Sequence, residues 1–429
     1  MKVYFGGMLQ RLVFISILLI AGGLSLYANS IEIPRLKGEI QFDGKLDELF
    51  WKQMPLFPTV QHVPYNGEKP SEDERIYLGY DDQYLYLAAE IQGANIQSPS
   101  RKRDEFSLKP DYIGLIIDSY HDKENALGFL TTPAALRSDF TVVEDAVGDY
   151  PINNDWNTFW DVKTVVGETS WTVEMRIPFS SLQFQDKDGD VEMGLIVMRL
   201  IASKNEFDTW PEIENAWGDW SPFKPSVAAT VTLKGVKAKK PVYVTPYLLA
   251  GASRVIDDKA PFEAMNRSEI NAGLDVKYNV TSNLTMDLTL NTDFAQVEAD
   301  DAQINLDRFN LFFPEKRQFF QERSAIFDLR VGGSSRIFYS RRIGIDDNGR
   351  LEKIWGGARL TGRVGDYDVG AINMTTRDDN WNPQTNFSVL RLRKKVVNDN
   401  SYVGIIGTNK FGQNGDYNSV YALDGTFRL

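Results

Sequence analysis

The chain has no cysteine and only two histidines among its 429 residues, and both scarcities narrow the chemistry open to it. Without cysteine there is no disulfide and no zinc site of the Cys or mixed Cys/His kind, and His62 and His121 are too few for an all-histidine metal site. Acidic side chains outnumber basic ones, 59 against 47, which gives a formal net charge of −12. A chain of this charge offers no overall basic field to a phosphate backbone, so nucleic acid is not an expected partner.

Long apolar runs are equally scarce, and the most marked one lies near the N-terminus. Lys2 and Arg11 precede an apolar run of about ten residues, Leu12 to Ala21, and Ala28-Asn29-Ser30 has the small-x-small pattern of a cleavage site. Because the run is shorter than the ~20 residues that span a bilayer, residues 1–30 are predicted to be a cleaved signal peptide rather than an anchor. No later segment reaches roughly 18 apolar residues, so membrane insertion of the mature chain would require a β-barrel.

Short runs of β-branched and aromatic residues dominate residues 31–235. Runs of this kind occupy 75–80, 84–89, 112–117 and 171–178, and turn residues separate them. Long amphipathic helical patterns are scarce. We therefore predict an all-β protein in which residues 31–235 form an antiparallel β-sandwich.

Beyond a basic, proline-containing junction at 234–241, the pattern changes to strict alternation of apolar and polar residues. Residues 270–280 and 284–291 show it most clearly. Further strands are expected at 354–363, 367–375, 387–396, 402–409 and 421–429. Such paired strands are typical of outer-membrane barrels, so residues 236–429 are predicted to be a barrel region, either a closed barrel of about eight strands or part of a larger one. A second water-soluble sandwich is the alternative.

The segment 292–344 interrupts this alternation, and we expect an ordered insertion because a structureless loop of that length is unusual. Its motifs are Thr292-Asp293-Phe294-Ala295-Gln296-Val297-Glu298-Ala299-Asp300, Phe313-Pro314-Glu315-Lys316-Arg317 and Phe319-Phe320. They resemble the hallmark of an outer-membrane family of Bacteroidetes-type bacteria, domain of unknown function 5916. Residues 42–51, FDGKLDELFW, resemble the opening motif of family 9 carbohydrate-binding modules. The resemblance implies a location in the outer membrane of a Gram-negative bacterium, a carbohydrate-binding-module-like sandwich and a barrel that is incomplete in this chain. It implies no known reaction.

Candidate sugar-binding residues are tryptophans in polar, loop-like surroundings, because sugars stack on flat aromatic faces and their hydroxyls pair with planar polar groups. Trp156 lies in Asn-Asn-Asp-Trp-Asn, and Trp217 and Trp220 flank Asp219. These four residues are predicted to bind ligand, and structural packing of the tryptophans is the alternative.

A calcium site is a second candidate, at the turn Asp186-Lys187-Asp188-Gly189-Asp190. The alternating carboxylates Asp186, Asp188 and Asp190 could converge on a hard cation, although the spacing does not follow the EF-hand pattern. A solvated turn is the competing interpretation.

These patterns predict an exported outer-membrane protein whose sandwich binds an oligo- or polysaccharide, in glycan capture or polysaccharide utilisation. Outer-membrane lipid and envelope proteins are its further expected partners. The alternative is a structural or transport barrel with an interaction domain that binds no sugar. A hydrolase of O-glycosyl compounds ranks third, because no nucleophile-elbow motif occurs and 59 acidic residues single out no catalytic pair. Exposure of the three tryptophans around a shared groove would favour the first hypothesis, and their burial the second.

Overall fold

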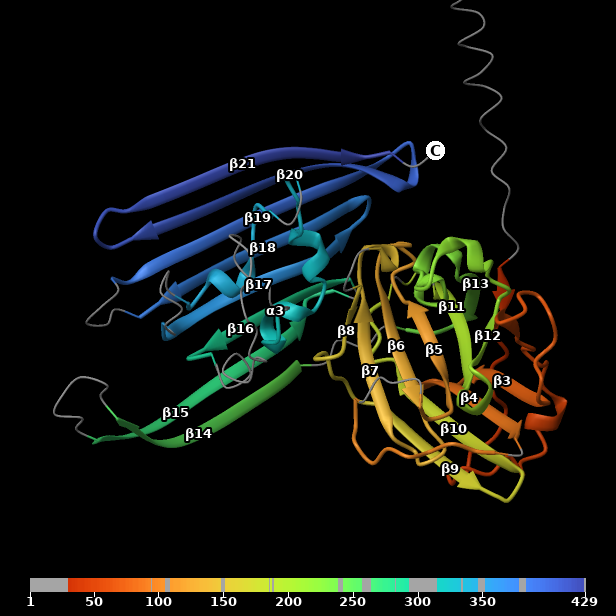
Figure 1. Ribbon diagram of the computed structural model, residues 1–429. Coiled ribbons are helices and arrows are strands. Elements are labelled where there is room, and N and C mark those ends of the chain that lie inside the picture. The colour runs from red at the N-terminus through yellow and green to blue at the C-terminus, as the bar shows by residue number, and fades with distance from the viewer. Residues whose placement is uncertain are drawn as a thin grey trace, which may run out of the picture.

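The computed structural model describes residues 30–93, 95–104, 109–147, 151–184, 186, 189–237, 242–256, 264–281, 283–292, 315–332, 335–345, 352–377 and 383–427. Within these segments the chain is almost entirely β-structure, and its strands form three sheets (Figure 1). The prediction of an all-β protein is therefore confirmed. The predicted signal peptide lies outside the described residues except for Ser30. None of the described helices has the length and apolar character needed to cross a membrane.

Two of the sheets are built from residues 31–234. The nine-stranded sheet has the order β1-β13-β11-β5-β6-β7-β8, with β12 pairing both β11 and β2. Its strands are β1 Ile31–Glu32, β2 Val60–Val63, β5 Tyr112–Asp118, β6 Ala126–Thr131, β7 Arg137–Val142, β8 Ile152–Asn153, β11 Asp190–Ile201, β12 Glu206–Trp210 and β13 Ala229–Lys234. The four-stranded sheet has the order β3-β4-β10-β9, formed by β3 Glu74–Tyr80, β4 Tyr84–Gln92, β10 Ser170–Pro178 and β9 Asp161–Val166. Apart from the parallel pair β1 and β13, the paired strands are antiparallel.

A shared apolar core holds these two sheets together as a sandwich. Alternate residues of β10, Trp171, Val173, Met175 and Ile177, are at most 2% exposed and meet the inner residues of the nine-stranded sheet. The alternation of β10 thus gives one apolar face that the other sheet buries. Nine short helices, eight of them 3-10 helices, lie between strands of the described chain: η1 Trp51–Gln53, η2 Glu144–Ala146, η3 Ala202–Lys204, η4 Asn215–Trp217, η5 Ser221–Phe223, η6 Pro225–Val227, the α-helix α3 Gln318–Gln321, η7 Ser324–Phe327 and η8 Ser340–Arg342.

The third sheet is an antiparallel meander of eight strands that pair in chain order. They are β14 Val242–Ile256, β15 Ala264–Asn279, β16 Leu284–Leu290, β17 Ile354–Val364, β18 Tyr367–Thr376, β19 Thr385–Val396, β20 Asn398–Gly412 and β21 Tyr417–Thr426. Each strand expected from the alternation is present. The sheet is open, because its edge strands β14 and β21 pair with β15 and β20 and not with each other (Figure 1). The described residues therefore do not form a closed eight-stranded barrel, and a barrel stays a prediction.

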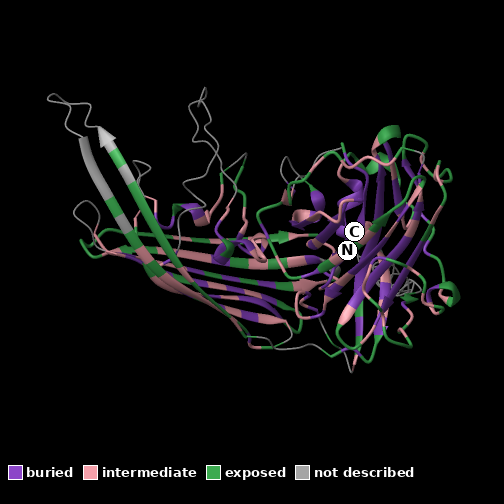
Figure 2. Cartoon of the chain, turned by 90° about the horizontal axis from the view of Figure 1, so that it is seen from below, coloured by how far each residue is buried: buried purple, intermediate pink, exposed green. Residues whose placement is uncertain are grey.

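The polarity of this sheet is the reverse of that in a water-soluble layer. On β19, Leu390 and Leu392 are 62% and 37% exposed. Arg391, which lies between them, is 1% exposed, and Arg393, which follows them, is 6% exposed. Strand β16 repeats the pattern, since Leu288 and Leu290 are exposed, its other apolar residues are half-buried, and its polar residues, Asp287 among them, are buried. Figure 2 shows buried and exposed positions alternating along these strands. One face of the sheet thus exposes apolar residues, and the other, which is covered, buries charged side chains beside apolar ones.

The cover is the inserted segment, which we define as residues 315–332 and 335–345. It carries α3, η7 and η8, and Phe319, Phe320 and Phe327 pack on apolar residues of β17 to β20. Buried arginines complete the contact, as the Nε of Arg391 donates to the backbone oxygen of Ile326 at 3.1 Å. The insertion predicted at 292–344 is ordered over its described part. Residues 293–314, which carry most of the first family motif, lie outside the described residues.

Candidate functional site

The sandwich, the inserted segment and the third sheet meet at one junction. Gln183 of the sandwich donates to Glu322 of the inserted segment, and Glu322 also pairs with Lys277 of β15. A second link runs directly from sheet to sandwich, where a guanidinium nitrogen of Arg393 lies 3.1 Å from Glu124. A third joins Arg330 to Glu144 at 2.9 Å. These polar contacts fix the junction, and two cavities lie within it.

The larger cavity is a cleft of about 370 Å³ between the sandwich and strands β14 to β16. Two aromatic rings, Phe159 of the sandwich and Tyr243 of β14, are stacked with their centroids 6.2 Å apart and an interplanar angle of 18°. Asn157 and Gln318 supply amides to the lining. Its volume falls within the ~300–1,000 Å³ of small-molecule sites, and aromatic faces beside amides suit a hydroxylated ligand.

The smaller cavity, of about 50 Å³, lies between the sandwich and the inserted segment. Trp156, Ser181, Gln183 and Glu322 line both cavities, so the two share a wall. Three polar atoms of other lining residues are buried without a hydrogen-bond partner, namely Asn125 Oδ1, Gln321 Oε1 and Arg323 Nη1. No sequence pattern predicts this arrangement, because the three residues come together only when the inserted segment docks on the sandwich.

The predicted sugar-binding residues do not form one groove. Trp156 is 6% exposed, and its ring packs edge-on against Phe129 at 6.2 Å in the sandwich core. Trp220 is half-buried and packs against Phe223, whereas Trp217 is 58% exposed and Asp219 is also exposed. Trp156 lines the junction cavities, and Trp217 and Trp220 line neither of them. The structure therefore separates Trp156 from the loop that carries the other three residues.

The predicted calcium residues lie at an exposed turn. Asp186 and Asp190 are exposed, and Asp186 accepts a hydrogen bond from the backbone N–H of Gly189 at 2.6 Å, as in an ordinary turn. Asp188 lies outside the described residues. Among the residues that the structure describes, no group of three or more acidic or histidine side chains is arranged to hold a metal ion. The calcium site stays a prediction.

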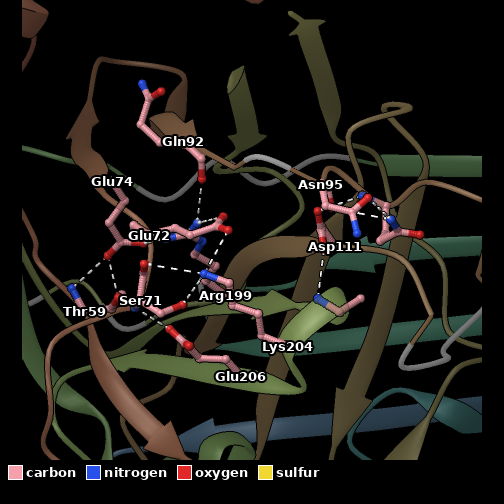
Figure 3. Close-up of polar contacts among 12 residues, drawn as sticks. Thr59, Ser71, Glu72, Glu74, Gln92, Asn95, Asp111, Arg199, Lys204 and Glu206 are labelled. Atoms are coloured by element: carbon pink, nitrogen blue, oxygen red, sulfur yellow. Dashed lines mark hydrogen bonds and ion pairs between the residues drawn. The ribbon is translucent and has the colours of Figure 1, made fainter. Parts of the chain in front are cut away.

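A buried ionic cluster at one end of the sandwich was not predicted from the sequence. Figure 3 shows Arg199 of β11 between the two sheets, where its guanidinium donates to Glu74 at 3.0 Å, to the backbone oxygen of Glu72 at 2.9 Å and to that of Gln92 at 3.1 Å. The sequence feature that could have predicted the cluster is the single arginine, Arg199, within the apolar run of residues 195–201. A charged side chain in a buried strand requires buried partners.

Asp208 belongs to the same cluster and has an unusual environment. It faces Arg199 across the β11–β12 pair, is fully buried, and neither carboxylate oxygen has a hydrogen-bond partner. Burial, together with the nearby charge of Glu206, raises the pKa of Asp208 to about 8. A raised pKa is typical of a catalytic acid, but Asp208 lines neither junction cavity, so we interpret the cluster as structural.

Comparison with known proteins agrees with the resemblance seen in the sequence. Residues 242–357, which hold β14 to β16 and the start of β17, match the model of the family described as domain of unknown function (DUF5916). No curated protein matches the chain.

Three solved structures show a likeness in fold to about half of the chain. A family 9 carbohydrate-binding module from Caldicellulosiruptor kristjanssonii in complex with glucose is 17% identical, with 49% of this chain and 98% of that chain covered and a TM-score of 0.35. A module of the same family and organism in complex with cellotriose is 18% identical, with coverages of 48% and 95% and a TM-score of 0.34. A protein from Bacteroides uniformis ATCC 8492 described as a candidate carbohydrate-binding protein is 15% identical, with coverages of 48% and 98% and a TM-score of 0.35.

Proposed function

We propose that residues 236–429 form the membrane region of an exported outer-membrane protein of a Gram-negative bacterium, with the apolar face of the third sheet in contact with lipid. The observation that carries this proposal is the reversed polarity of the sheet. Strand β19 shows this polarity, because it exposes Leu390 and Leu392 and buries Arg391 and Arg393. In lipid the leucines lose no hydrophobic stabilisation, and the arginines face a polar interior.

The buried charges of the sheet are paired, as an interior of this kind requires. Arg359 lies opposite Asp287 on neighbouring strands, with 3.2 Å between their side-chain atoms. Arg391 binds Asp424 through two hydrogen bonds of 2.5 and 2.6 Å. A second water-soluble sandwich would instead bury apolar side chains and expose charged ones. The pairs therefore favour a barrel-like interior.

The lengths of the connections indicate which side of the membrane the sandwich occupies. At the end where the sandwich joins β14, the strands are connected by residues 280–283, by 365–366 and by Val397 alone. At the opposite end the connections include 257–263, 291–353 and 377–384. Outer-membrane barrels have short periplasmic turns and longer extracellular loops. We therefore place residues 31–235 on the periplasmic side, as a domain that docks against the inserted segment in a structural or transport role.

A carbohydrate ligand for the sandwich is the second candidate function, in glycan capture or polysaccharide utilisation. It is favoured by the loop of residues 215–220, where Trp217 is 58% exposed beside the exposed carboxylate of Asp219. A large exposed aromatic ring next to a planar acceptor is the pairing that binds a sugar ring and its hydroxyls. The proposal depends on this loop, because likenesses with TM-scores below 0.5 do not bear on ligand binding.

Labelling with maleimides tests the membrane proposal directly, because the chain has no cysteine of its own. A single cysteine at Leu390 is expected to resist permeant and impermeant maleimides alike in intact and in permeabilised membranes, because its thiol does not ionise in hydrocarbon, and to react once the chain is unfolded in denaturant. A cysteine at exposed Leu49 of the sandwich is expected to react with the impermeant reagent only after the outer membrane is permeabilised. Reaction of the Leu390 position with the impermeant reagent in intact vesicles would contradict a lipid-facing sheet.

A further inference from the structure

A groove of about 470 Å³ lies on the apolar face of the third sheet, where β16 ends and β17 begins. This end of the sheet is remote from the sandwich (Figure 1). Most of its lining residues are apolar and come from three neighbouring strands, namely Leu274 and Val276 of β15, Leu288 and Leu290 of β16, and Trp355 of β17. Thr375 of β18 lines it as well. An exposed apolar hollow of this kind is typical of a surface that binds a partner or a ligand.

A β-bulge shapes the groove. The pairing of β17 with β18 slips between Ile354 and Gly356, so Trp355 is an extra residue on β17. Ile354 is 1% exposed and packs under the inserted segment, whereas Trp355 is 54% exposed beside the groove. A Cβ at Gly356 would lie only 2.7 Å from a backbone oxygen of β16, so the two strands approach closely with no side chain between them. The bulge thus turns an aromatic ring outward next to a stretch of bare backbone.

Arg377 places a positive charge beside the groove. The carbon of its guanidinium lies 4.3 Å from the centre of the Trp355 ring. Its backbone N–H donates to the backbone oxygen of Lys353 at 2.6 Å, which holds residue 377 against the start of β17. Aromatic and basic side chains near the ends of membrane-spanning elements lie at the level of the lipid headgroups. A guanidinium binds phosphate through paired, charge-assisted hydrogen bonds, so the apolar groove ends beside a side chain that suits phosphate.

Polar side chains adjoin the groove on the next two strands. Asn386 of β19 is paired with Thr375 of β18, and its Nδ2 donates to the Oγ1 of Thr375 at 3.0 Å. At the neighbouring pair, the Nδ2 of Asn373 donates to the Oγ of Ser388 at 2.8 Å, and Asn373 is exposed. Alternation along β19 places Asn386 and Ser388 on the same face as Leu390. Amides and hydroxyls at the edge of an apolar face suit the hydroxyls of a lipid headgroup.

We infer that this groove binds one phosphorylated lipid of the outer leaflet, with an acyl chain on the apolar residues of β15 and β16, the phosphate on Arg377 and the headgroup hydroxyls on the amides of Asn373 and Asn386. The inference rests on the proposed membrane role of the third sheet. It goes further, because a lipid-facing surface contacts any lipid, whereas this groove retains one of stated charge. The outer leaflet follows from the position of the groove, since its end of the sheet is remote from the sandwich, which we place on the periplasmic side.

Native mass spectrometry of the full-length chain in detergent, titrated with lipid, tests the site. Three probes separate the parts of the ligand. Dioleoyl phosphatidic acid carries chains and phosphate, dioleoylglycerol carries the chains alone, and glycerol phosphate carries the phosphate alone. Phosphatidic acid is expected to remain on the chain as a single bound molecule, and dioleoylglycerol to bind roughly tenfold more weakly, because it lacks the phosphate that Arg377 binds. Glycerol phosphate is expected not to displace the lipid, because it has no chain for the groove.

Two variants alter the site, and each has a matched control on the same sheet. Arg377→Gln removes the charge, and Val276→Phe fills the groove; each is expected to weaken the binding of phosphatidic acid about tenfold. Lys394→Gln is the control for charge, because the Nζ of Lys394 lies 5.4 Å from the ring centre of Tyr367 at the opposite end of the sheet. Leu390→Phe is the control for size, because Leu390 is exposed on the apolar face outside the groove. Both controls are expected to bind phosphatidic acid as the wild type does.

The outcomes separate this site from the membrane proposal. If each control weakens binding as much as its matched variant, lipid binds along the whole face and the site is overturned. Equal binding of phosphatidic acid and dioleoylglycerol would overturn the phosphate assignment. If the cysteine at Leu390 resists maleimide while no phosphatidic acid is retained, the membrane proposal stands and the lipid site alone is overturned. If that cysteine reacts with the impermeant reagent in intact vesicles, both are overturned. Circular dichroism identifies a variant that does not fold, and the other variant then carries the test.

Discussion

Asp208 makes the stability of the sandwich depend on pH in an unusual direction. Its pKa is about 8 in the folded chain, above the ~3.9 of an unfolded aspartate, because burial and Glu206 disfavour the charged form. The folded state therefore holds a proton that the unfolded state releases between about pH 4 and pH 8. The stabilisation is complete below pH 4 and is lost as the pH rises towards 8.

Asp208→Asn should remove this dependence, because the amide is neutral at every pH. We expect the variant and the wild type to unfold at similar urea concentrations near pH 4.5, and the variant to be more stable by roughly 2 kcal/mol or more at pH 8.5. Tryptophan fluorescence in urea titrations between pH 4.5 and 9 measures the difference. Asp82→Asn, at an exposed side chain, is the control and should follow the wild type. If the free energy of unfolding of Asp208→Asn depends on pH as steeply as that of the wild type, another group binds the proton.

The tryptophans show how far a sequence can locate a site. Trp156 and Trp217 both stand among polar residues, and both were predicted as platforms. Asp155 and Asn157 are exposed while Trp156 between them turns into the core beside Phe129, whereas the ring of Trp217 points outward. The polarity of neighbours predicts a loop, but the direction of one side chain depends on the core that it meets. The residues that line the smaller junction cavity come together only when the inserted segment docks on the sandwich, so no local sequence pattern predicts them.

Strands β15 to β21 were predictable because one face of each is apolar and the period is two. Strand β14 was not predicted, since Pro246 and Gly251 interrupt its pattern. Its position explains why they are tolerated: β14 is an edge strand, where a missing backbone N–H can face away from the ladder. The parallel pairing of β1 with β13 joins residues about 200 apart in the chain, and no local signal encodes it.

A charge placed on the apolar face of β19 distinguishes lipid from water. Leu390 lies in the middle of the strand and is 62% exposed, so Leu390→Arg removes no packed side chain. In lipid the substitution should cost about 2–4 kcal/mol, because arginine is unfavourable near the bilayer midplane. The measurement is urea unfolding of the chain refolded into phosphatidylcholine vesicles. Leu49→Arg, at a leucine 75% exposed on the sandwich, should change the free energy of unfolding by less than about 0.5 kcal/mol. Equal, small effects at both positions would favour a face in contact with water.

Docking of the sandwich on the third sheet rests on a few side chains of the inserted segment, and two arginines make different contributions. The guanidinium of Arg323 lies 4.0 Å from the ring centre of Tyr120 in the sandwich and 3.7 Å from Asp368 of the sheet, and its side chain is 7% exposed. Arg330 also reaches the sandwich, at Glu144, but its side chain is 43% exposed. Buried contacts of the first kind are worth more than solvated ion pairs of the second.

Arg323→Met should therefore weaken docking by about 2–4 kcal/mol, whereas Arg330→Met should weaken it by about 1 kcal/mol or less. Because the chain has no cysteine, a donor and an acceptor dye can be attached at cysteines replacing Val147 and Val331, which are 57% and 59% exposed on the sandwich and the inserted segment. Energy transfer during a urea titration then reports separation of the two before either unfolds. If both arginine variants separate at the same urea concentration, burial of Arg323 is not what holds the junction, and the direct pair between Arg393 and Glu124 becomes the principal contact.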